Sequence, residues 1–121
     1  MYLYKNVNYQ QNPEMVDNLE YWKIPFLDFV DSLRFYKDTS LIEIPIVNDH
    51  EKFDALLAST IEYLCNELRI KAPDWVWDIA ACKEPWFVSG MENLKAIAIA
   101  ESPVYFRRRK IFVLQNFLDR V

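Results

Sequence analysis

A run of four consecutive cations is the most chemically suggestive feature of this sequence. The run consists of Arg107, Arg108, Arg109 and Lys110. Guanidinium groups pair bidentately with carboxylates and with phosphates. Because successive side chains point in different directions on a helix or a strand, at most two of the four can face one ligand. The run therefore predicts a surface for a partner protein, a surface for nucleic acid, or ion pairs within the fold.

Three tryptophans lie shortly before this run, at Trp75, Trp77 and Trp86. Aromatic and Arg side chains are enriched at protein–protein interfaces, so together with the cations they are the candidate partner-binding residues. The alternative is a structural corner in which the tryptophans pack over a central helix, because large aromatic side chains also dominate ordinary cores.

The residues needed for common catalytic or metal sites are scarce. His50 is the sole histidine, and it lies beside Asp49, Glu51 and Asp54, as expected for the start of a helix. One histidine does not make a metal site, and no nucleophile elbow, Cys-x-x-Cys or zinc-protease motif occurs. We therefore assign no catalytic residue, metal or cofactor. An uncharacterised enzyme stays an alternative, because acid–base chemistry could be assembled from carboxylates in a cleft.

Other polar groups have simple structural interpretations. The carboxylates of Asp28, Asp31, Glu62 and Glu67 are expected on exposed helix faces. Two cysteines, Cys65 and Cys82, have apolar neighbours and are expected to be reduced, partly buried thiols.

Composition indicates a helical globular protein. The 121 residues are 52% apolar and 16% aromatic, which suits one domain with a bulky core. Gly90 is the single glycine, so tight hairpins and glycine-rich phosphate loops are not expected. The chain is acidic, with a net charge of −4, which weakens the case for a general nucleic-acid binder. Neither a signal peptide nor an apolar run long enough to span a membrane is found, so we expect a cytoplasmic protein.

The apolar periodicity predicts an all-α fold, a single compact bundle-like domain over residues 1–121 with about five or six helices and short extended connectors. Helices are expected over about 13–22, 25–37 (opened by Pro25), 50–70 and 91–101, with a short turn in 78–82 and helical segments after Pro103 and over 117–121. Residues 1–12 are expected to form an N-terminal arm, flexible or packed. Segments 41–47 and 111–114 are expected to be extended, and could pair with each other.

Several blocks of the second half resemble a small, poorly characterised bacterial family. They are FDALLA at 53–58, APDW at 72–75, PWFVSG at 85–90, SPVYFRRRKIFV at 102–113 and LDRV at 118–121. Members of that family occur alone or behind a helix-turn-helix domain, and accompany a predicted nucleotidyltransferase in toxin–antitoxin-like settings. The resemblance implies a bacterial accessory or antitoxin-like protein that binds another protein, and it supplies no enzymatic activity.

The favoured hypothesis is therefore a non-enzymatic protein–protein interaction module, with a nucleotidyltransferase encoded nearby as the candidate partner. Nucleic-acid binding through the cations at 107–110 is the first alternative. The sequence does not decide whether the chain forms a homodimer.

Overall fold

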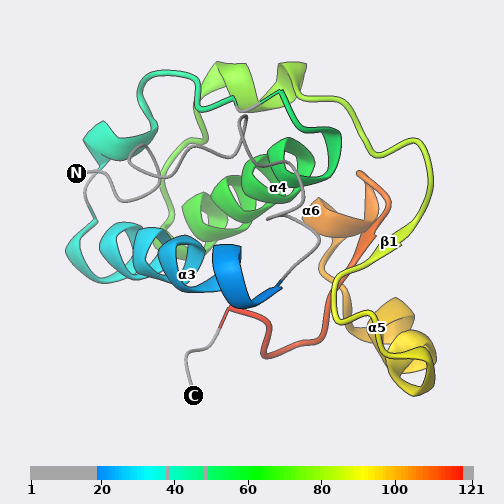
Figure 1. Ribbon diagram of the computed structural model, residues 1–121. Coiled ribbons are helices and arrows are strands. Elements are labelled where there is room, and N and C mark those ends of the chain that lie inside the picture. The colour runs from blue at the N-terminus through cyan, green and yellow to red at the C-terminus, as the bar shows by residue number, and fades with distance from the viewer. Residues whose placement is uncertain (1–18, 38, 48, 119–121) are drawn as a thin grey trace.

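Helix α4 (Glu51–Leu68) runs through the middle of the structure, as the periodicity over 50–70 predicts (Figure 1). The computed structural model describes residues 19–37, 39–47 and 49–118. His50 caps the helix, because its Nδ1 accepts a hydrogen bond from the Phe53 N–H at 3.4 Å. The helix ends at Arg69, whose left-handed backbone (φ 61°) lets the N–H of Ile70 bond to the Cys65 carbonyl at 2.9 Å.

Helix α3 (Leu19–Tyr36) packs alongside α4 and contains Pro25 (Figure 1). The prediction that Pro25 opens a helix is wrong. A proline inside a helix costs about 3 kcal/mol. Phe26, Val30 and Leu33 are fully buried, and burying each such side chain contributes about 1.5–3 kcal/mol, so the packing outweighs the proline.

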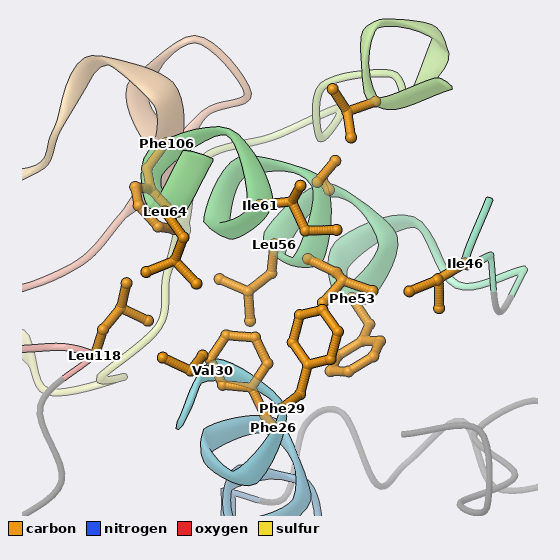
Figure 2. Close-up of a cluster of buried hydrophobic side chains, with 14 of the residues drawn as sticks. Phe26, Phe29, Val30, Ile46, Phe53, Leu56, Ile61, Leu64, Phe106 and Leu118 are labelled. Carbon is orange, nitrogen blue, oxygen red and sulfur yellow. The ribbon is translucent and has the colours of Figure 1, made fainter. Parts of the chain in front are cut away.

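The core lies between these two helices and extends to the C-terminal segment (Figure 2). Phe26 of α3 meets Phe53 of α4 edge to face, with ring centroids 6.3 Å apart, and contacts Phe117 at 5.8 Å. Such aromatic pairs add to the gain from burial. Part of the large aromatic content of the sequence therefore packs in the core.

The connector between α3 and α4 is only partly as predicted. Leu41, Ile42 and Ile46 are buried, so the segment packs on the core as expected. However, its first part forms a 3₁₀ helix, η1 (Thr39–Ile42), and is not extended. The expected pairing of 41–47 with 111–114 is also wrong.

The strand pair joins other segments instead. Strand β1 (Trp86–Phe87) pairs in parallel with β2 (Ile111–Phe112). The phenyl rings of Phe87 and Phe112 stack across this pair at 4.9 Å. A parallel pair needs a long crossover, and the chain supplies one between the two strands.

The crossover consists of short helical elements. They are η3 (Glu92–Leu94), α5 (Lys95–Glu101) and α6 (Val104–Arg107). Figure 1 shows α5 projecting at the periphery, on the side of the structure away from η1. Before β1 lies η2 (Asp74–Asp78), so the short turn expected over 78–82 falls earlier than predicted.

The described residues confirm a mostly helical, all-α fold. They contain four α-helices, α3 to α6, so the expected five or six are not supported by this part of the chain. The predicted arm over 1–12, residues 13–18 of the first predicted helix and the end of the segment 117–121 lie outside the described residues. Within 19–37, 39–47 and 49–118, no helix combines the length and apolar character that crossing a membrane requires.

Candidate functional site

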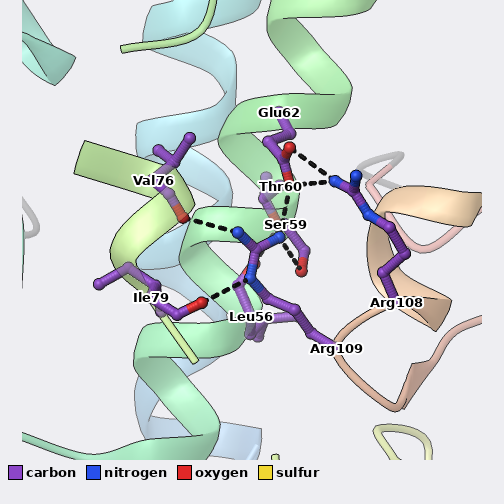
Figure 3. A network of polar contacts seen from close by, with 8 residues as sticks. All are labelled: Leu56, Ser59, Thr60, Glu62, Val76, Ile79, Arg108 and Arg109. Atoms are coloured by element: carbon purple, nitrogen blue, oxygen red, sulfur yellow. Dashed lines mark hydrogen bonds and ion pairs between the residues drawn. The ribbon is translucent and has the colours of Figure 1, made fainter. Parts of the chain in front are cut away.

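Arg109 is part of the interior. It is 6% exposed, and its guanidinium joins η2 to α4 (Figure 3). Nη2 donates to the Val76 carbonyl at 2.6 Å, Nε donates to the Ile79 carbonyl at 3.3 Å, and Nη1 pairs with the Glu62 carboxylate. These contacts give Arg109 a structural role, as one of the sequence-based alternatives for the run expects.

Glu62 is the centre of this network, and its expected position on an exposed helix face is wrong. Its side chain is 2% exposed and pairs with both Arg109 and Arg108. A buried carboxylate is tolerated when it is paired and hydrogen-bonded. Residues Ala55 to Glu62 of α4 are all buried, and Ser59 also bonds to Arg109, so this carboxylate lies inside the fold.

Arg108 differs from Arg109 because its side chain is 46% exposed. Its Nη2 lies 2.9 and 2.7 Å from the two Glu62 oxygens. Its guanidinium carbon lies 5.4 Å from the Trp77 ring centroid and 5.9 Å from that of Tyr105. Both distances fall within the range of cation–π attraction, so two aromatic side chains and a buried carboxylate hold this cation in place.

The other two cations of the run are exposed. Lys110 has a left-handed backbone (φ 62°), and its Nζ donates to the Lys83 carbonyl at 3.3 Å. For Arg107, the described residues provide no side-chain hydrogen bond or ion pair, whereas its backbone N–H bonds to the Pro103 carbonyl at 3.1 Å. The run therefore divides into one interior, one half-exposed and two exposed side chains.

The three candidate tryptophans also divide. Trp75 packs against the core, and its Nε1–H donates to the Ile42 carbonyl at 2.8 Å, which ties η2 to η1. Trp86 is half-buried in β1, with the Lys52 ammonium 5.8 Å from its ring centroid. Trp77 is 56% exposed and is the one that meets Arg108. The structure therefore brings together Trp77 and Arg108, and adds Tyr105, which was not among the predicted partner-binding residues.

Helix α5 is a second exposed feature, and the sequence analysis missed it. Between Lys95 and Glu101 every residue is Ala or Ile, yet Ala98 alone among them is buried. Ile97 and Ile99, the two large side chains of the helix, are 46% and 50% exposed. A helix that is apolar all round is normally covered by other protein. The signal available in the sequence was this absence of a polar face.

The exposed helix is firmly attached to the fold. The buried Ser102 hydroxyl donates to the Ala98 carbonyl at 2.5 Å and accepts from the Val113 N–H at 2.8 Å. At the end of α5, Glu101 accepts from the Gln115 N–H at 2.8 Å. Between α5 and the segment 114–116 lies an open groove of about 440 Å³, lined by Leu94, Ile97, Glu101, Leu114, Gln115 and Asn116.

The remaining candidates are structural. His50 lies at the start of α4, as expected, and its own side chain caps the helix. Cys65 and Cys82 are free and buried. Burial, aided by the Glu62 carboxylate, raises the pKa of the Cys65 thiol to about 11, and burial also raises that of Cys82. Among the described residues, no three His, Cys, Asp or Glu side chains gather where they could hold a metal ion.

Comparison with known proteins adds no relative. No protein-family model, no curated protein and no solved structure matches this chain.

Proposed function

We propose that this chain is a non-enzymatic protein–protein interaction module, and that α5 with its groove is the surface that a partner protein covers. The observation that supports this proposal is the exposure of an apolar helix. Ile97 and Ile99 of α5 are each about half exposed, and so are Met91 and Val104, which lie shortly before and after α5 in the sequence. Contiguous apolar surface rimmed by polar residues is characteristic of protein interaction sites.

The charges around this surface favour an apolar partner. Lys95 pairs with Glu92 at 3.2 Å and lies over the Phe87 ring at 5.2 Å, while Glu101 is engaged by the Gln115 backbone. The charges at the two ends of α5, on Lys95 and Glu101, are thus already engaged. The occupant we propose is therefore an apolar helix or strand face of another protein.

A second part of the proposal is the kind of protein that binds α5. The sequence blocks at 85–90 and 102–113 resemble those of a bacterial family that accompanies a nucleotidyltransferase, and β1, α5, α6 and β2 fall in or between these blocks. We propose an antitoxin-like or accessory role in which α5 docks on a nucleotidyltransferase encoded nearby. Nucleic-acid binding receives less support, because Arg109 is buried and the chain as a whole is acidic, with a net charge of −4.

Co-expression with the neighbouring nucleotidyltransferase tests this proposal. Tagged wild-type protein should retain the enzyme on an affinity column, whereas Ile97→Asp should release it, because a charge is placed in the apolar contact. Ile44→Asp is the matched control, since Ile44 is 66% exposed and lies in the connector between η1 and α4, outside α5. Equal retention by both variants would contradict the assignment of α5. A wild-type dimer that Ile97→Asp dissociates would assign the surface to a second copy of the chain.

A further inference from the structure

The surface around Arg108 is separate from α5 and has different chemistry. It consists of the Arg108 guanidinium with the Trp77 and Tyr105 rings, and is called the Arg108 site below. Arg109 occupies the interior beneath it, on the far side of the shared carboxylate of Glu62 (Figure 3). One carboxylate therefore faces two guanidinium groups, and the network carries one excess positive charge.

Arg108 has donors left over. Both of its hydrogen bonds use Nη2, and in the described part of the chain neither Nε nor Nη1 has a hydrogen-bond partner. An arginine presents five N–H donors, and the Nε–H and Nη1–H groups that Glu62 leaves unused can each donate to a second carboxylate. Trp77 likewise has no partner for its indole N–H within the described residues, and its side chain is 56% exposed.

The Arg108 site is also preorganised. The bonds to buried Glu62 and the two nearby rings restrict the rotamers of a long side chain before any ligand arrives. Ordering a flexible side chain at an interface normally weakens binding, so a cation already held in place binds more tightly than a free one. Aromatic and arginine side chains together are typical of interface hot spots.

We propose that the Arg108 site binds an acidic side chain of the partner protein, with the carboxylate on Arg108 and its apolar stem against Trp77. This inference rests on the proposed function, because it names the chemistry that the partner presents. The exposed side chains of Arg107 and Lys110 add positive charge near this position and favour an acidic segment. A phosphate backbone fits less well, because nucleic-acid binders normally align many cations, whereas this chain has a net charge of −4.

The test uses the isolated full chain and short peptides. The probe is acetylated, amidated tetraglutamate, with tetraglutamine as its uncharged counterpart, and the readout is the NMR shift of the Arg Nε–H and Trp indole N–H signals. We expect saturable shifts of the Arg108 and Trp77 signals with tetraglutamate and none with tetraglutamine. Inorganic phosphate and a thymidine tetranucleotide at equal ionic strength should shift the same signals less.

Variants separate recognition from general charge. Arg108→Lys keeps the charge but lacks the fork, and should weaken tetraglutamate binding at least about tenfold. Arg107→Lys is the matched control and should change it less than about twofold. Trp77→Leu keeps Arg108 and should weaken binding about threefold through loss of one ring. Thermal unfolding of each variant confirms that it is folded.

Three results would overturn the inference: equal shifts with tetraglutamine, tighter binding of the tetranucleotide through Arg108, or equal effects of the two lysine variants. The peptides are tested without the nucleotidyltransferase. A negative result therefore counts against the Arg108 site alone and says nothing about the co-expression test. If Ile97→Asp releases the enzyme and tetraglutamate does not bind, the α5 assignment stands and the Arg108 site is refuted.

Discussion

Replacing Arg109 with methionine should destabilise the protein severely, although a cation within a charged run would ordinarily be regarded as a surface residue. The substitution keeps much of the side-chain volume but removes the donors to Glu62, Val76 and Ile79. Every one of these bonds is donated by the charged guanidinium, so none of them is a neutral hydrogen bond. Breaking a buried ion pair costs about 3–5 kcal/mol, and this is the loss of stability that we expect.

Two neighbours in the run provide controls with the same chemical change. Arg107→Met alters an exposed side chain without an ion-pair partner in the described residues, and should change stability by less than about 0.5 kcal/mol. Arg108→Met removes a half-exposed pair with Glu62, for which solvent screening limits the loss to about 1 kcal/mol. The expected order of destabilisation is therefore Arg109 far above Arg108, and Arg108 above Arg107.

The assay is equilibrium unfolding in urea, followed by tryptophan fluorescence and far-UV circular dichroism at about 15 °C, where small domains are close to maximal stability. Coincident transitions and equal slopes allow free energies to be compared. Combining Arg109→Met with Glu62→Gln should cost less than the sum of the single changes by about 1–3 kcal/mol, because both remove the same pair. A loss below about 1 kcal/mol for Arg109→Met, or strict additivity, would refute the reasoning.

Two further predictions follow from the interior. The Cys65 thiol, with its pKa raised to about 11, should stay protonated at pH 8 and react with a disulfide reagent only after unfolding. Because the thiol of the unfolded chain ionises at lower pH, the free energy of unfolding should fall between pH 9 and pH 11. The variant Cys65→Ala should lack this part of the pH dependence. Rapid labelling of the native protein at this position would contradict it. Trp75→Phe should lower the free energy of unfolding by about 1 kcal/mol more than the smaller buried side chain alone would, because it removes the hydrogen bond to the Ile42 carbonyl. Trp77→Phe, at an exposed position, should be nearly neutral. Equal losses in the two variants would show that this hydrogen bond contributes nothing.

The sequence predicted those elements that depend mainly on residues close to one another in the chain. Helix α4 follows from the spacing of Phe53, Leu56, Ile61 and Leu64, although its cap at His50 was not predicted. Pro25 misled the prediction because its effect on the backbone is visible in sequence, while the packing of Phe26 on another helix is not.

The division of the cationic run could not be predicted, because it depends on residues distant in sequence. Glu62 lies 46 and 47 positions before the two arginines that it pairs with. Nothing near Glu62 marks it as buried except the small neighbours Ala58 and Ser59, which leave room for a guanidinium. Trp75 and Trp77 are two residues apart, yet one supports the core and the other is exposed, since their roles depend on where η2 contacts η1 and α6.

The short parallel ladder between β1 and β2 has a consequence for how this protein can diversify. The N–H groups of Cys82, Trp86 and Val88 bond to the carbonyls of Arg109, Lys110 and Phe112, so the chain that carries α5 leaves and returns at a closed base. Once the two ends of a loop are fixed, doubling the length between them costs only about 0.6 kcal/mol. Insertions between Gly90 and η3, and changes at the exposed positions Ile97 and Ile99, can therefore accumulate with little effect on the core, whereas Ala98 and Glu101 keep α5 attached to the fold. The exposed face of α5 can therefore change, and with it the partner that it binds, while the core around α4 keeps its sequence.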